Sequence, residues 1–158
     1  MNCLPKPNLP KFLNEEPWTT GRIGGRLYFS DPFIQKHLGN WGWTEFEEDL
    51  VLPCSTILPL IQDDKYLVKL PLEDVAWRGK HCFPMLAFNQ CPCCKGERYK
   101  VLDLSFPIIV TDMSNPYNDK YRTLDGSHRC AQLTNIGHTH VWAFYLPFSL
   151  LKQHFVPR

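Results

Sequence analysis

The sequence contains no long hydrophobic run. No stretch of about eighteen apolar residues occurs, so a membrane-spanning helix is not expected. The N-terminus, from Met1 to Pro7, also lacks the basic segment followed by an apolar core that marks a secretory signal. These two absences predict a soluble protein of the cytoplasm that has no membrane partner.

An excess of charge of either sign is also missing. The chain has 17 Lys and Arg residues against 16 Asp and Glu residues, which gives a formal net charge of +1. Proteins that hold nucleic acid mainly through their electrostatic field carry a larger positive charge, so that class is disfavoured, although a local basic face leaves DNA open as a partner. With 158 residues, 44% of them hydrophobic and 13% aromatic, the chain fits one globular domain with a sizeable core.

Proline and helix-start signals divide the chain into three parts. Four prolines fall within the first seventeen residues, so residues 1–20 are predicted to form an extended arm that lies on the domain or on a partner. Capping residues at Ser30 or Asp31 and at Thr44, each followed by a helix-like pattern, predict a helical extension over residues 21–65. The third part is predicted to be the main domain, residues 66–158, with a cysteine-rich insertion at 81–96.

The seven cysteines are an odd number at irregular positions: Cys3, Cys54, Cys82, Cys91, Cys93, Cys94 and Cys130. Because no secretory signal is present, a disulfide framework is not expected, and thiols or metal ligands are favoured. The segment Cys91–Gly96 has the Cys-Pro-x-Cys-x-Gly pattern of half a zinc ribbon, and the nearest further donors are His81 and Cys82. The predicted Zn²⁺ ligands are therefore Cys91, Cys94, Cys82 and His81. A redox Cys-x-x-Cys pair and a reduced loop without metal are the alternatives, and Cys130 is predicted to be a small core residue.

The most informative stretch runs from Tyr121 to Leu133, where an alternating strand leads into Asp-Gly-Ser-His-Arg and then into a helix. Gly126 allows a positive φ angle or a close approach of the backbone to a ligand. The first N–H groups of a helix have no partner within it, and the helix dipole favours an anion at that end. A strand-to-helix turn of this composition predicts a phosphate-binding site.

The side chains of the turn add to this prediction. Arg129 offers a bidentate fork for phosphate, and His128 is a titratable donor. Asp125 is a carboxylate able to accept a proton or hold a metal ion. The alternative is an ordinary helix start, in which Asp125 caps the helix and Arg129 lies on the surface.

The turn resembles that of the ParB/sulfiredoxin superfamily, and the likeness extends over its surroundings. That family has a strand ending in Pro-x-x-Val, a variable loop, a strand that leads into a Gly-x-x-Arg turn with its helix, and a strand after a glycine. The same order occurs here in Phe106–Val110, residues 111–120, the turn at 125–129, and Asn135–Pro147. The resemblance implies an α+β fold, a single compact domain with a small mixed sheet and helices.

Within the superfamily, the residues of the turn resemble most those of the Asp-Gly-x-His-Arg members. These members include free-serine kinases and the DGQHR-type proteins of DNA phosphorothioation systems. By that resemblance the phosphate-binding candidates are Gly126, Ser127, His128 and Arg129, and the catalytic candidates are Asp125 and His128. Lys80 is a further candidate, as a second cation for the phosphates, because an early strand of the superfamily leads to a loop that contacts the nucleotide. Sulfiredoxin chemistry is disfavoured because Ser127 stands where those enzymes carry a cysteine. A ParB partition activity is disfavoured because the downstream helix-turn-helix domain of that family has no counterpart here.

The first functional hypothesis is a nucleotide enzyme. By the resemblance it binds ATP or ADP with Mg²⁺ and transfers or hydrolyses a phosphoryl group, with Asp125 as the base and a small molecule or a protein as acceptor. The second hypothesis is a non-catalytic regulatory module that binds a nucleotide or DNA, such as an accessory factor of a phage or mobile element in the cytoplasm of a bacterial or phage-infected cell. A ParB-like nuclease and a protein-interaction scaffold with a relic pocket are further alternatives.

Overall fold

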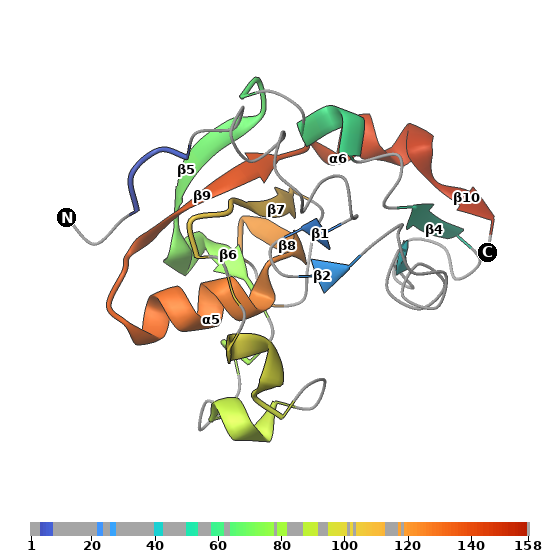
Figure 1. The fold of residues 1–158 in the computed structure, drawn as a ribbon. Coiled ribbons are helices and arrows are strands. Elements are labelled where there is room, and N and C mark those ends of the chain that lie inside the picture. The colour runs from blue at the N-terminus through green and yellow to red at the C-terminus, as the bar shows by residue number, and fades with distance from the viewer. Residues whose placement is uncertain are drawn as a thin grey trace.

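The computed structural model describes residues 4–7, 22–23, 26–27, 40–42, 50–53, 58–61, 64–77, 79–81, 87–91, 95–100, 102, 104–112, 117 and 119–157. A curled sheet of five strands forms the centre of this part of the chain (Figure 1). Its strands, in spatial order, are β5 (Leu67–Pro71), β9 (His140–Tyr145), β7 (Ile108–Thr111), β8 (Tyr121–Asp125) and β6 (Val75–Ala76).

The central sheet is mixed. β5 runs antiparallel to β9, and β7 runs antiparallel to β8, whereas β7 is parallel to β9 and β6 is parallel to β8. The connection from β8 to β9 passes over β7 and contains the helix α5 (Ser127–Asn135). A second short helix, α6 (Phe148–Leu151), follows β9. The described part is therefore a small α+β fold, as the sequence predicts.

Short elements surround the sheet. The remaining strands are β1 (Arg22–Ile23), β2 (Arg26–Leu27), β3 (Asn40–Gly42), β4 (Leu50–Pro53) and β10 (Val156–Pro157). The 3₁₀ helices are η1 (Leu58–Ile61), η2 (Leu72–Asp74), η3 (Phe88–Gln90), η4 (Glu97–Lys100) and η5 (Lys152–His154). β1 pairs with β2, and β10, β4 and β3 form an antiparallel sheet that joins the C-terminal strand to β3 and β4.

The predicted helical extension, residues 21–65, is described only in part. Its described pieces are the short strands β1 to β4 and the 3₁₀ helix η1. The helix starts predicted at Ser30 or Asp31 and at Thr44 lie outside the described residues. Residues 4–7 of the predicted arm lie on the domain, since the carbonyl of Leu4 accepts a hydrogen bond of 2.9 Å from Trp142 Nε1.

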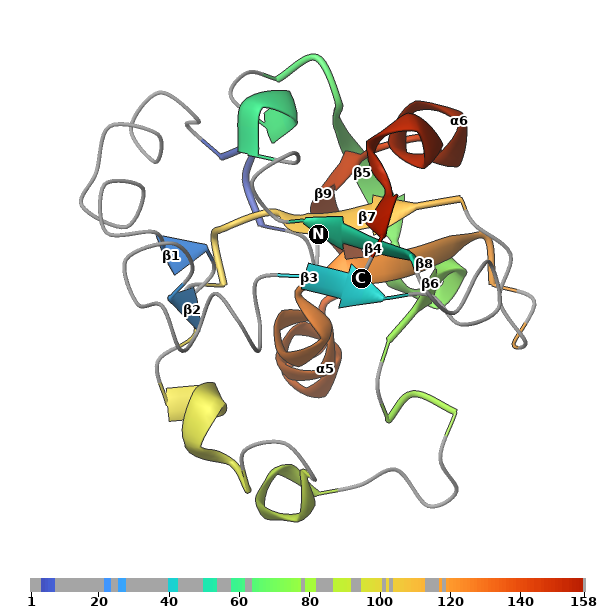
Figure 2. The same cartoon turned by 90° about the vertical axis from the view of Figure 1, so that its right-hand side faces the viewer.

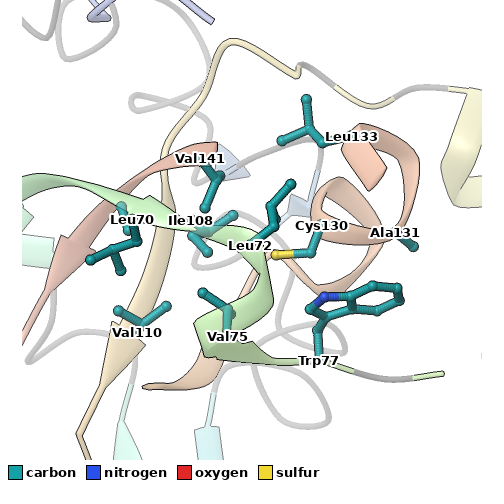
Figure 3. Packing of buried hydrophobic residues seen from close by; sticks show 11 residues of the cluster. Leu70, Leu72, Val75, Trp77, Ile108, Val110, Cys130, Ala131, Leu133 and Val141 are labelled. Carbon is teal, nitrogen blue, oxygen red and sulfur yellow. The ribbon is translucent and has the colours of Figure 1, made fainter. Parts of the chain in front are cut away.

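The two faces of the sheet bury separate hydrophobic clusters because side chains of a strand alternate between its faces. On β7, Ile109 belongs to one cluster while Ile108 and Val110 belong to the other. The helix α5 covers the second face and α6 lies on the opposite side (Figure 2). In the second cluster Cys130 of α5 points toward Leu72, beside the Trp77 ring (Figure 3).

The helix α5 begins and ends at glycines with positive φ. The N–H of Cys130 donates the first helical hydrogen bond, of 2.9 Å, to the carbonyl of Gly126. At the other end Gly137 has φ +95°, and the N–H of His138 donates to the carbonyl of Leu133 at 2.9 Å. This Schellman arrangement ends the helix and sends the chain back into β9. None of the helices in the described part of the chain is long and apolar enough to cross a membrane.

Candidate functional site

Gly126 forms the turn between β8 and α5. Its φ and ψ angles are 111° and 16°, in the left-handed region, as the sequence predicts for this position. A Cβ atom placed on Gly126 would overlap the Ile108 side chain, at 2.8 Å from the Ile108 Cβ, and would lie 2.9 Å from Arg129 Nη2. The close approach that requires glycine here is therefore the packing of the turn against β7.

An ion pair between Asp125 and Arg129 lies inside the turn. Arg129 Nη2 donates to Asp125 Oδ2 at 3.0 Å, and both side chains are only 1% exposed. Arg129 Nη2 also lies 3.4 Å from the carbonyl oxygen of Pro107, and the guanidinium stands 5.7 Å from the centroid of the Phe106 ring. Arg129 is therefore buried, whereas the alternative of an ordinary helix start predicts it on the surface.

A β-bulge explains why Asp125 points inward. Asp125 is paired with Ile109, whereas Thr123 is paired with the next residue, Val110, so β8 contains one extra residue. A bulge breaks strict alternation, so that neighbouring residues can both face the interior. Leu124 and Asp125 are accordingly both buried, at 5% and 2% exposure.

The amino end of α5 keeps the features of an anion site. The helix has nine residues, and the N–H groups of Ser127, His128 and Arg129 precede the first intrahelical hydrogen bond. Ser127 is the first residue of the helix and is partly exposed, unlike the two residues that follow it. From Asp125 to Arg129, Ser127 is therefore the residue with the most exposure to solvent.

His128 faces the cysteine-rich insertion. Its ring is buried, and Nε2 lies 3.5 Å from Cys91 Sγ. The Tyr99 ring meets the imidazole edge-on at 5.0 Å between centroids, and Tyr99 itself stacks on Phe88 at 4.0 Å. The sequence shows no sign of this contact, because 37 residues separate the thiol from the imidazole.

Lys80, the predicted second cation for the phosphates, is bound to acceptors of the protein. Its Nζ donates to the carbonyls of Glu73 at 2.7 Å and Val75 at 2.9 Å, and to Asp119 Oδ1 at 2.9 Å. An ammonium group has three protons, so these acceptors match its capacity. The contacts join η2 and β6 to the segment that leads into β8.

The two predicted zinc ligands that the structure describes, His81 and Cys91, have different neighbours. His81 Nε2 lies 2.6 Å from Asp119 Oδ2, and its ring stacks on Tyr117 at 4.2 Å, whereas Cys91 lies against His128. Cys82 and Cys94 lie outside the described residues. Among the residues that the structure describes, no three His, Cys, Asp or Glu side chains are grouped to hold a metal ion.

Cys130 is a core residue, as predicted. Its side chain is fully buried in the cluster under α5. Burial raises the pKa of the Cys130 thiol to about 12, against the opposing effect of the nearby Arg129 charge. The thiol is therefore neutral at physiological pH and is a poor nucleophile.

The chain matches no family model, no curated protein and no solved structure.

Proposed function

We propose that this protein is a nucleotide-binding regulatory protein of the ParB/sulfiredoxin-like fold, and that the phosphates of ATP or ADP bind at the amino end of α5. The observation that carries the proposal is the left-handed Gly126 turn, which exposes Ser127 at the start of a nine-residue helix. Backbone N–H groups and the helix dipole favour phosphate at such an end. The order β7, β8, Gly-x-x-Arg turn, α5 and β9 supports the fold assignment.

The buried ion pair favours binding over catalysis. Asp125 and Arg129 are 3.0 Å apart and almost fully buried, so they stabilise the turn from behind and leave Ser127 and the helix N–H groups to contact phosphate oxygens. His128 belongs to this support, since its ring lies under Tyr99. Mg²⁺ bound to the nucleotide would neutralise the remaining phosphate charge. The small net charge of the chain favours a nucleotide over DNA as the ligand.

Phosphoryl transfer or nucleotide hydrolysis is the second candidate function, favoured by the position of Asp125 two residues before Ser127. A bound phosphate would attract the Arg129 guanidinium and release the Asp125 carboxylate. Asp125 would then take the proton of a hydroxyl or water as that oxygen attacks the terminal phosphorus, with ADP as the leaving group.

A thermal-shift panel of ATP, ADP, CTP and GTP, each with and without Mg²⁺, tests the binding proposal on the full chain. We expect ATP or ADP to raise the Tm, since a ligand at a hundred times its Kd stabilises the folded state by about 2.7 kcal/mol. Ser127→Asp is the deciding variant. It places negative charge at the helix start, which suits the helix dipole but repels phosphate, so the variant should fold and lose the shift.

Ser149→Asp is the matched control, because Ser149 is an exposed residue near the start of α6. If no nucleotide raises the Tm, or if Ser127→Asp keeps the full shift, the proposed site is wrong. A response to CTP alone would point to a ParB-like nucleotide preference instead. Turnover that is present in the unaltered protein and lost in Asp125→Asn, with binding retained, would establish the enzyme.

A further inference from the structure

A small lobe, formed in its described part by residues 87–91 and 95–100, lies beside α5 and away from the central sheet (Figures 1 and 2). It contains the 3₁₀ helices η3 and η4. The lobe meets α5 at the amino end, where Cys91 Sγ lies 3.5 Å from Nε2 of His128, the second residue of the helix. The lobe is thus a direct neighbour of the proposed phosphate site, because His128 follows Ser127.

The aromatic rings of the lobe form a series that begins at the same end of α5. The Tyr99 ring meets the His128 imidazole at 5.0 Å between centroids and at an angle of 62°. The Phe88 ring stacks on Tyr99 almost in parallel, at 4.0 Å and 8°. The rings therefore lead from the second residue of α5 into the lobe and end, among the described residues, at Phe88.

The stacked pair keeps part of its surface open to solvent. Phe88 and Tyr99 are both partly exposed, and the residues on either side of Phe88, Ala87 and Asn89, are exposed. Aromatic rings bind further flat rings by offset stacking, and every nucleic-acid base has a flat aromatic face. The lobe thus offers a surface on which a base can stack.

Another stacked pair, His81 and Tyr117, lies elsewhere in the fold. His81 is held by Asp119, which precedes β8, whereas α5 begins after the last residue of β8. The pair of Phe88 and Tyr99 combines parallel stacking with a contact to the amino end of α5. This combination places an aromatic surface next to the proposed phosphate site.

We infer that the base of the nucleotide stacks on Phe88 and Tyr99, an assignment that rests on the proposed phosphate site at α5. A ribose separates the base of a nucleotide from its phosphates by a few bonds, so a base joined to phosphates at Ser127 comes within reach of rings that start at His128. A purine has two fused rings and buries more surface on the stack than the single ring of a pyrimidine. The lobe therefore selects purine over pyrimidine nucleotides.

Calorimetric titration of the full chain with ATP and with inorganic tripolyphosphate, each with Mg²⁺, tests the stacking. Tripolyphosphate carries the phosphate chain of ATP without its base and ribose, so the ratio of the two affinities measures what these groups add. ATP and GTP are expected to bind about 10-fold or more tightly than tripolyphosphate. The affinities for CTP and UTP should lie between those for ATP and tripolyphosphate.

Phe88→Leu removes the aromatic face and keeps an apolar side chain. This variant is expected to lower the affinity for ATP by about 10-fold and to leave the affinity for tripolyphosphate unchanged. Phe155→Leu is the matched control, because Phe155 is also partly exposed and packs on another ring, that of Phe148, near the C-terminal end of the chain. The control variant should bind both ligands as the unaltered protein does.

The comparison of ATP with tripolyphosphate uses the unaltered protein, so it decides the matter even if Phe88→Leu fails to fold. Equal affinities for ATP, CTP and tripolyphosphate would overturn the stacking and leave the phosphate site standing. An equal loss of both affinities in Phe88→Leu would also overturn it, since Phe88 would then only support the lobe. If neither ATP nor tripolyphosphate binds, the phosphate site itself is wrong, and the stacking with it.

Discussion

Arg129 Nη2 lies 3.0 Å from Asp125 Oδ2, and the two side chains are each 1% exposed. The pair spans one turn, from the last residue of β8 to the third residue of α5. Removal of one partner of a buried ion pair leaves the other charge inside the protein without its counter-ion, which costs much more than the loss of a surface pair.

Arg129→Met is therefore expected to lower the free energy of unfolding by about 3–5 kcal/mol. Lys6→Met is the control, because the Lys6–Asp64 pair has side chains that are 58% and 64% exposed, and its loss is expected to cost less than about 1 kcal/mol. Urea denaturation measures both variants. An equal, small loss in both would show that the buried pair contributes little to stability.

Gly126→Ala is expected to destabilise the protein through two additive effects. Positive φ strain costs about 1–3 kcal/mol, and the overlap with Ile108 adds about 1–3 kcal/mol of overpacking. Gly79→Ala is the matched control, since Gly79 also has positive φ, at 88°, but no atom lies within 4 Å of its added Cβ. The difference between the two variants in urea denaturation isolates the contacts with Ile108 and Arg129, and no difference would mean that the turn can move away from these side chains.

The variant Lys80→Met tests whether Lys80 stabilises the fold or binds the phosphates of a nucleotide. Because its ammonium joins two carbonyls to Asp119, the substitution is expected to lower the free energy of unfolding by about 1–3 kcal/mol. The Tm increase caused by ATP or ADP should be unchanged. Lys120→Met, at a side chain that is 72% exposed, is the control for charge alone. A variant of normal stability that has lost the nucleotide response would instead make Lys80 a ligand-binding residue.

The neutral Cys130 thiol makes stability depend on pH in the alkaline range. Burial raises the pKa of Cys130 from 9.0 to about 12, so between these values the unfolded chain loses this proton and the folded protein keeps it. Stability from this residue is thus present below pH 9 and is lost as pH rises toward 12. The stability of the unaltered protein should fall relative to Cys130→Ala over this window in urea titrations. A constant difference would show that the buried thiol ionises as readily as in the unfolded chain.

The parts of the fold that the sequence predicts best are those specified by neighbouring residues. The strand before Gly126 and the helix after it occur where the alternation and the glycine place them, and a strand also lies at the Pro-x-x-Val segment, over Ile108–Thr111. Gly126 is predicted correctly because a positive φ at a strand-to-helix turn excludes most other residues. These signals are local, and no tertiary contact is needed to read them.

The environment of the site could not be predicted in this way. Arg129 is buried because the turn packs on β7 and places the guanidinium beside Phe106 and Pro107, a contact between segments more distant in the sequence. The bulge that turns Asp125 inward leaves no clear mark in the sequence. His128 meets Cys91 only because the insertion folds back onto α5, and an arginine or histidine at a helix start gives no sign of such a neighbour.

The order of the strands also has a consequence for how the chain folds during synthesis. β5 pairs with β9, in the register Leu67 with Phe144, and β4 pairs with β10, in the register Val51 with Val156. Each early strand must therefore wait for this partner until β9 or β10 has left the ribosome. The pairing of β5 and β4 with these strands is thus a late step of folding, and in the interval their open edges are sites at which aggregation can begin.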